Sequence, residues 1–140
     1  MGRNYEHVVQ YYETDAMQIV HHSNYIRWFE EARTWWLSEK VMSYHKLEDM
    51  GLMMPILSLN AKYQEMMRFG DVASIRLEVT KLSPVKMVIS YQVYNKESEA
   101  LCVTGDSVLG FLDKETGKPV SVKKSYPELY EALGLHIMKG

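Results

Sequence analysis

Cysteine is almost absent from this chain, because Cys102 is the only one among 140 residues. An internal disulfide is therefore excluded, and the sequence suits a reducing compartment. No run comes near the roughly 20 apolar residues that a membrane-spanning helix needs, and Met1–Glu6 has no apolar signal-peptide core. We therefore expect a cytoplasmic protein without a membrane span, in which Cys102 is a small buried hydrophobe.

An excess of charge of either sign is missing too. Lys and Arg number 16 and Asp and Glu number 18, so the formal net charge is −2. This balance argues against nucleic-acid binding, which needs broad neutralisation of phosphates, and leaves room only for a local patch that holds an anionic ligand. Repeats and linkers are also lacking, and hydrophobic residues make up 46% of the chain. We expect one domain over residues 1–140.

Two kinds of catalytic motif are missing. The adjacent His21 and His22 form no His-Glu-x-x-His pattern and have no third ligand at a suitable spacing, so we expect no metal site and no cofactor. Ser23 follows His22 but is not part of a Gly-x-Ser-x-Gly turn, which argues against a Ser-His-Asp hydrolase. Because the two histidines are neighbours, one should face water if the other faces the core.

One long amphipathic helix is predicted to begin between His22 and Asn24. Apolar residues recur at spacings of three and four, which places them on one face of a helix. They are Tyr25, Trp28, Phe29, Ala32 and Trp36. The other face is polar and carries Arg27, Glu30, Glu31 and Thr34. The pattern predicts a helix that buries one aromatic face.

Strands are predicted on both sides of this helix. A β-rich stretch covers Tyr5 to Glu13, and after Pro55 the apolar residues alternate with polar ones, which is typical of half-buried strands. The expected inward-facing residues are Leu57, Leu59, Ala61 and Tyr63, then Ala73, Ile75, Leu77 and Val79, then Met87, Ile89, Tyr91 and Val93. A longer strand should cover Leu101–Leu112. Short turns join these strands, so they should pair antiparallel.

The order of these elements predicts an α+β fold. An antiparallel sheet of about five to six strands should wrap around one long central helix, because only the concave face of the sheet can bury the aromatic stripe. Ser125 and Glu128 are spaced as a capping box, which predicts a short C-terminal helix that ends near Gly134.

Asp15 is the first candidate for a functional residue. It lies between the first predicted strand and the start of the long helix, so its carboxylate and the unpaired N–H groups of the helix could meet one polarised carbonyl. The alternative is that Asp15, which follows Thr14, makes a loop turn or caps backbone donors. Both interpretations stay open on the residues alone.

A longer pattern around Asp15 resembles a known family. Tyr12-x-Thr-Asp, the apolar pair Ile19-Val20, His22, and Asn24-Tyr-x-x-Trp-Phe-Glu-x-Ala-Arg are similar to the signature of the 4-hydroxybenzoyl-CoA thioesterase family, especially its bacterial short-chain acyl-CoA thioesterase branch, which has the hot-dog fold. Weaker likenesses continue along the chain at Tyr63, Arg68, Gly70-Asp71 and residues 105–119.

The resemblance implies roles for several residues. It places the catalytic acid at Asp15, and at His22 the residue whose backbone N–H faces the thioester oxygen. Val20, Gln18 and Tyr25 fall at substrate-binding positions, with Tyr25 in the place of a pocket-lining tyrosine. The chain departs from the family where Gln18 replaces a usual glycine, Met17 a small residue and Met66 a proline. These bulkier side chains are expected to narrow or reshape the acyl pocket.

Thioester hydrolysis fits this set of residues. The reaction needs an oxyanion stabiliser, which N–H groups at a helix start can supply, and a carboxylate that attacks the carbonyl or activates water. Whether Asp15 is a nucleophile or a general base stays open, as does the part of the His22 imidazole. Lys81 and Lys86 flank the Ser83-Pro84 turn and are the expected contacts for the anionic part of CoA.

We therefore predict a cytoplasmic acyl-CoA thioesterase that uses neither metal nor organic cofactor. The resemblance implies a homodimer whose sheets join edge to edge, with active sites at the interface, or a tetramer. The alternative is a non-catalytic acyl-binding or aromatic-thioester-binding module of the same fold. A dehydratase is less consistent with the sequence because its differently placed His and acid pair is missing. The acyl group and the carrier, CoA or acyl-carrier protein, stay open.

Overall fold

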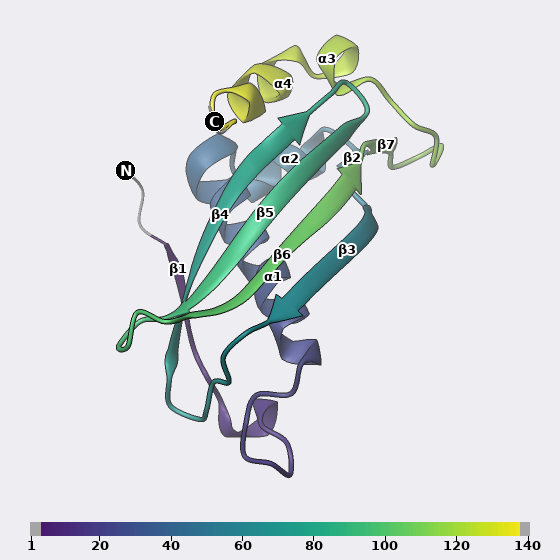
Figure 1. Ribbon diagram of the computed structural model, residues 1–140. Helices are drawn as coiled ribbons and strands as arrows, with labels where there is room; N and C mark the ends of the chain where they lie inside the picture. Colours follow the sequence, from purple (N-terminus) through teal and green to yellow (C-terminus); the bar gives the residue numbers. More distant parts are fainter. Residues whose placement is uncertain (1–3, 138–140) are drawn as a thin grey trace. The chain divides into compact units, whose positions relative to one another are not determined.

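The first strand is followed by the long helix and then by a run of strands, in the order that the sequence predicts. The computed structural model describes residues 4–137 (Figure 1). The elements are β1 (Tyr5–Val8), the 3-10 helix η1 (Tyr11–Glu13), α1 (Ser23–Trp36), the π-helix η2 (Leu37–Val41), α2 (Tyr44–Asp49), β2 (Leu52–Met53), β3 (Ile56–Tyr63), β4 (Val72–Leu82), β5 (Lys86–Asn95), β6 (Leu101–Gly110), β7 (Leu112–Asp113), α3 (Val122–Ser125) and α4 (Pro127–Gly134). Residues 1–3, where no signal-peptide core was expected, lie outside the described residues.

Contacts along the chain separate two units. The first comprises residues 1–35, 61–77 and 91–105, and the second comprises residues 36–60, 78–90 and 106–140. The single domain expected over residues 1–140 stays a prediction. No helix within residues 4–137 has the length and apolar character needed to cross a membrane.

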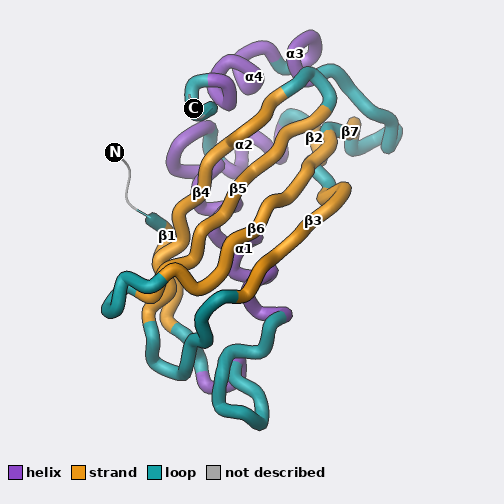
Figure 2. The backbone as a smooth tube through the Cα atoms, in the orientation of Figure 1, coloured by secondary structure: helices purple, strands orange, loops and turns teal. Residues whose placement is uncertain are grey.

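Five strands form the main sheet, in the order β1-β4-β5-β6-β3 (Figure 2). β1 runs antiparallel to β4, with Tyr5 opposite Ile75. Tight turns join the next pairs, because the Ser83 N–H donates to the Lys86 carbonyl at 2.8 Å and the Asn95 N–H to the Ala100 carbonyl at 2.9 Å. A second sheet pairs β2 with β7, also antiparallel. The predicted antiparallel α+β architecture is confirmed.

Within the first unit, α1 packs its aromatic face on β5. Phe29 stacks on Tyr91 with ring centroids 4.4 Å apart and an interplanar angle of 11°, and Arg33 Nη1 donates to the Tyr91 hydroxyl at 3.3 Å. The predicted buried stripe is confirmed, since Tyr25, Trp28, Phe29, Ala32 and Trp36 are all buried. Each large side chain buried in this way contributes about 2 kcal/mol to stability.

The predicted strand pattern is confirmed for β5, for three of the four inward positions of β4 and only in part for β3. Ala73, Ile75, Val79, Met87, Ile89, Tyr91 and Val93 are at most 1% exposed, whereas Leu77 is half-buried. In β3, Leu59 and Ala61 are half-buried as predicted, but Leu57 is 54% and Tyr63 50% exposed. β3 is an edge strand of the sheet, so it has a neighbouring strand on one side only. In the single chain its apolar residues therefore have fewer neighbours to cover them. Cys102 is buried as predicted, and burial raises the pKa of its thiol, which disfavours the reactive thiolate.

Two local predictions need correction. The first strand ends at Val8 and is followed by a 3-10 turn, so it does not continue to Glu13. The C-terminal helix exists and ends at Gly134, but Ser125 does not cap it. Ser125 is the last residue of α3, and α4 restarts at Pro127, because a proline disfavours helical backbone in the residue before it.

Candidate active site

Asp15 lies at the base of a tight hairpin loop in the first unit. The Asp15 N–H donates to the Ile19 carbonyl and the Gln18 N–H to the Asp15 carbonyl, both at 2.9 Å. This is the pattern of a three-residue hairpin loop, which requires one residue in the left-handed region. Gln18 takes that conformation with φ 65°. A glycine would take this conformation without strain, whereas Gln18 takes it at a cost in strain.

The Asp15 carboxylate is half-buried and has one backbone partner. Its Oδ1 accepts a hydrogen bond from the Met17 N–H at 2.8 Å. The turn-forming interpretation of Asp15 is thus confirmed. Within residues 4–137 no hydrogen bond occupies Oδ2. Asp15 can therefore form the turn through Oδ1 while Oδ2 stays available to a substrate.

The start of α1 offers one backbone donor without an acceptor. His21 caps the helix, because its Nδ1 accepts from the Ser23 N–H at 3.2 Å and its carbonyl accepts from the Asn24 N–H at 3.0 Å. The Tyr25 N–H reaches the His22 carbonyl at 3.3 Å. Among the described residues, no acceptor is placed on the His22 N–H. That N–H is therefore available to a ligand oxygen.

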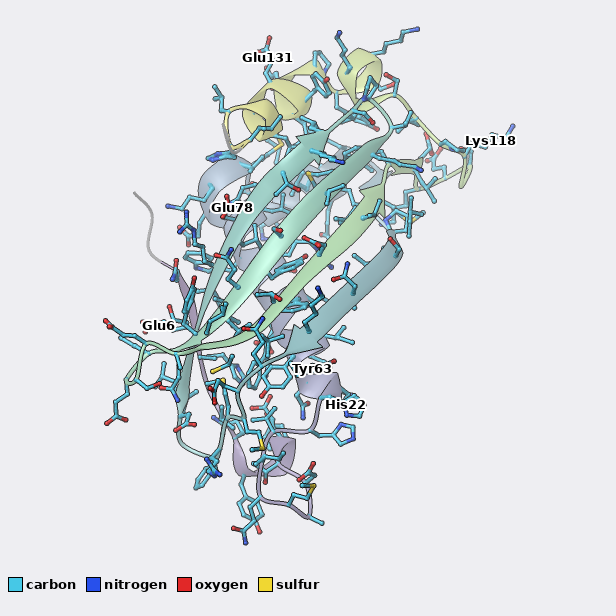
Figure 3. The ribbon with its side chains drawn as sticks, in the orientation of Figure 1. Glu6, His22, Tyr63, Glu78, Lys118 and Glu131 are labelled. Atoms are coloured by element: carbon cyan, nitrogen blue, oxygen red, sulfur yellow. The ribbon has the colours of Figure 1, made fainter. Side chains whose placement is uncertain are left out.

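The side chains of His21 and His22 are both exposed, so neither histidine belongs to the core. Their ring centroids are 4.1 Å apart. On its other side the His22 ring meets Tyr63 edge-on, with centroids 6.2 Å apart, and Figure 3 shows these two side chains next to each other at the start of α1. No cluster of three metal-ligating side chains occurs in the part of the chain that the structure describes.

Tyr25 and Val20, which lie on either side of His22 in the sequence, are both buried. Tyr25 meets Trp28 edge-on at 4.9 Å and lies 5.6 Å from the Tyr63 ring. Val20 is 4% exposed and its N–H donates to the Met67 carbonyl at 2.9 Å. Burial raises the pKa of Tyr25 to about 12, so its hydroxyl stays neutral at ordinary pH. The Tyr63 contacts with Tyr25 and His22 were not predicted, since they join distant segments.

Glu13 is a residue at this site whose role the sequence did not reveal. It is only 5% exposed, which is unusual for a carboxylate. Its Oε1 accepts from the Gln10 N–H at 2.8 Å and from His7 Nε2 at 2.7 Å, and its Oε2 accepts from Trp28 Nε1 at 2.7 Å. Burial alone would raise the pKa of Glu13, but these hydrogen bonds hold it below its usual value. Glu13 is therefore a buried anion.

Lys81 and Lys86 belong to the second unit. There they line an open groove of about 520 Å³ together with Thr80, Leu82, Ser83, Val88, Val108 and Ile137. Both lysines are exposed. The β4–β5 turn fixes Lys86, because its N–H donates to Ser83 Oγ at 3.1 Å. Asp15, Gln18, Val20, His22 and Tyr25 all lie in the first unit, and the role of the two lysines in holding CoA stays a prediction.

Comparison with known proteins gives consistent matches along the chain. The sequence model of the thioesterase-like superfamily matches residues 9–133. The putative acyl-CoA thioesterase YneP of Bacillus subtilis is 32% identical over 124 residues, which is 89% of each chain. The acyl-CoA thioesterase YbgC of Helicobacter pylori is 25% identical over 132 residues, covering 89% of this chain and 97% of that protein.

A solved structure supports the same relationship. The crystal structure of the DHNA-CoA thioesterase from Staphylococcus aureus superimposes with a TM-score of 0.88 at 30% identity. The match covers 95% of this chain and 89% of that one.

Proposed function

This chain belongs to the thioesterase-like superfamily, and we propose that it cleaves acyl-CoA thioesters with the Asp15 carboxylate at the start of α1. The hot-dog fold and the thioester hydrolase activity expected from the sequence are both confirmed. The assignment of individual residues is our proposal. It depends on one observation: a carboxylate oxygen and a backbone donor without an acceptor, both belonging to the loop and helix start of one unit.

The His22 N–H is the proposed oxyanion donor. It belongs to the positive end of α1, where the helix dipole favours negative charge. When the thioester carbonyl is attacked, its oxygen becomes an anion that this N–H stabilises. Loss of one such donor typically costs roughly 3 kcal/mol of transition-state stabilisation.

Asp15 supplies the attack. Its carboxylate either adds to the acyl carbon, giving a mixed anhydride that water then opens, or takes a proton from water that adds directly. In both routes the C–S bond breaks, and the sulfur leaves with its electron pair and takes up a proton. The products are a carboxylate and free CoA. The first route needs the unoccupied oxygen of Asp15 to face the acyl carbon, and the second needs it to face a water molecule placed against that carbon.

Val20, Tyr25 and Gln18 are proposed to contact the acyl group. The first two are buried apolar surfaces beside the helix start, and Gln18 is at the bend of the Asp15 loop. Lys81 and Lys86 are proposed to attract the anionic part of CoA, because phosphate groups bind best near exposed cations. The naming of the Bacillus and Helicobacter relatives as acyl-CoA thioesterases supports CoA as the carrier.

We also propose a homodimer that joins through β3. This strand ends the sheet order and exposes Leu57 and Tyr63, and exposed apolar edge strands invite pairing with a second copy. A cytoplasmic location stays a prediction, supported by the free thiol of Cys102.

Release of free thiol from a panel of short, long and aromatic acyl-CoAs tests the proposed function. We expect turnover of at least one member by the wild-type chain and none above background by Asp15→Asn. The matched control is Asp113→Asn, because Asp113 Oδ1 likewise accepts from the backbone N–H two residues later, that of Glu115, at 2.8 Å. Full activity of Asp15→Asn would reject the role of Asp15, and a preference for acyl-carrier protein would reject CoA.

A further inference from the structure

We propose that Glu13 is a positioning residue for thioester hydrolysis, which holds the Asp15 loop against the start of α1. The inference rests on the proposed function, because it assumes that Asp15 and the His22 N–H act on the substrate. Glu13 itself is buried and is not expected to touch the acyl group.

The backbone carbonyl of Glu13 closes the loop that carries Asp15. It accepts a hydrogen bond from the His21 N–H at 2.9 Å and another from Asn24 Nδ2 at 2.8 Å. The two ends of the loop formed by residues 14–20 are therefore held together at Glu13. A movement of Glu13 would therefore shift Thr14, which precedes Asp15, and His21, which precedes His22, at the same time.

The side chain of Glu13 anchors the base of the Asp15 loop in the core. Its donors come from three different places: the Gln10 N–H just before η1, His7 on β1 and Trp28 on α1. A carboxylate with donors on both oxygens has no freedom to rotate. The loop base is thus tied to β1 and to α1 at the same time.

His7 is a hydrogen-bond partner of the buried Glu13 carboxylate. Its Nε2 lies 2.7 Å from Glu13 Oε1, and its Nδ1 lies 3.2 Å from Glu31 Oε2 on the exposed face of α1. The His7 ring also lies 4.7 Å from the Trp28 ring. Removing the partner of a buried charge is costly, so this arrangement maintains Glu13 in a single place.

A residue that positions the reacting groups should affect turnover more than binding. Catalysis by a carboxylate and an oxyanion donor depends steeply on geometry, and a displacement of about 1 Å can cost about 100-fold in rate. Val20 and Tyr25 have contacts that do not involve Glu13 or its partners, because the Val20 N–H donates to Met67 and the Tyr25 ring lies beside Tyr63. We therefore expect Glu13 variants to lose kcat while KM stays close to the wild-type value.

The experiment compares Glu13→Gln with the wild-type full-length protein on the best acyl-CoA of the panel. The substitution keeps the size of the side chain but replaces one acceptor oxygen with a donor. We expect kcat to fall about 10-fold or more and KM to change by no more than about twofold. Glu30→Gln makes the same change on the exposed face of α1 and should leave both constants unchanged.

Leu129→Ala separates positioning from general stability. Leu129 is fully buried in α4, in the second unit, so its truncation should lower the melting temperature without touching the Asp15 loop. Assayed well below its melting temperature, Leu129→Ala should retain the wild-type kcat. If Glu13→Gln does not fold, His7→Gln takes its place, because it alters a hydrogen-bond partner of Glu13 at a more exposed position.

Three results would overturn the inference: a wild-type kcat in the Glu13 variant or its His7 replacement, a rise in KM alone, or an equal loss of kcat in Leu129→Ala. Failure of the proposed function looks different. In that case the wild-type chain releases no thiol, or Asp15→Asn remains active, whatever the Glu13 variant does.

Discussion

Asp15 Oδ1 accepts a 2.8 Å hydrogen bond from the Met17 N–H, so the proposed catalytic carboxylate also holds the shape of its own loop. An asparagine at this position keeps an oxygen acceptor for that N–H, whereas an alanine does not. The contribution of the Asp15 side chain to stability can therefore be measured separately from its contribution to thioester hydrolysis.

We predict that Asp15→Asn loses thioester hydrolysis but keeps the stability of the wild-type protein, so both unfold at the same urea concentration. Asp15→Ala should lose hydrolysis equally and about 1 kcal/mol of stability in addition, because the Met17 N–H loses its acceptor. Urea titration followed by circular dichroism measures the stability of each variant. A large destabilisation of Asp15→Asn would mean that its inactivity reports a damaged loop.

Gln18→Gly should stabilise the protein by about 0.5 kcal/mol. Left-handed backbone costs a residue with a side chain roughly 1–2 kcal/mol, and glycine avoids this strain but loses more entropy on folding. We also expect the variant to accept longer or wider acyl groups, because the proposed acyl contact with the Gln18 side chain is removed. Urea unfolding and the acyl-CoA panel test the two effects.

Glu99→Gly is the matched control for Gln18→Gly. Glu99 is the other non-glycine residue with positive φ in residues 4–137, at 64°, and it lies in the β5–β6 turn. It should gain similar stability without any change in acyl preference. An identical change in preference for both variants would remove Gln18 from the acyl pocket.

Tyr25 should make the folded protein sensitive to alkali. Burial raises the pKa of its hydroxyl to about 12, so between pH 10 and pH 12 the unfolded chain releases a proton that the folded chain keeps. The stability from this group is complete below pH 10 and falls by about 1.4 kcal/mol per pH unit above it. Tyr25→Phe should lack this part of the decline, as measured by urea unfolding at pH 9 and pH 11.5.

Local patterns in the sequence were enough to predict the long helix and the inward faces of β4 and β5, because each depends on spacing within one element. The exposure of Leu57 on β3 depends on the order of strands in the sheet, which spacing does not encode. Glu13 escaped prediction because its partners His7 and Trp28 come from two other elements. Pro127 similarly overrode the capping pattern that begins at Ser125.

Lys81→Gln and Lys86→Gln are predicted to raise KM for acyl-CoA without lowering kcat, because uniform electrostatic binding acts on the substrate before and during the reaction. The increase should shrink at high salt. An acyl thioester of N-acetylcysteamine, which lacks the phosphates, should show no change. Lys118→Gln is the control, since Lys118 is exposed in the turn after β7 and points into solvent (Figure 3).

Leu57→Lys should separate the proposed dimer. Leu57 is 54% exposed on the edge strand β3, where a charged side chain at a paired edge would oppose the approach of a second copy. We expect the wild-type chain to sediment as a dimer or tetramer in analytical ultracentrifugation and the variant as a smaller species. Val85→Lys places the same charge at a 47% exposed position in the β4–β5 turn and should leave the assembly unchanged. If the wild-type chain sediments as a monomer at micromolar concentration, the proposed β3 interface is wrong. Hydrolysis would then have to be carried out by residues of a single chain.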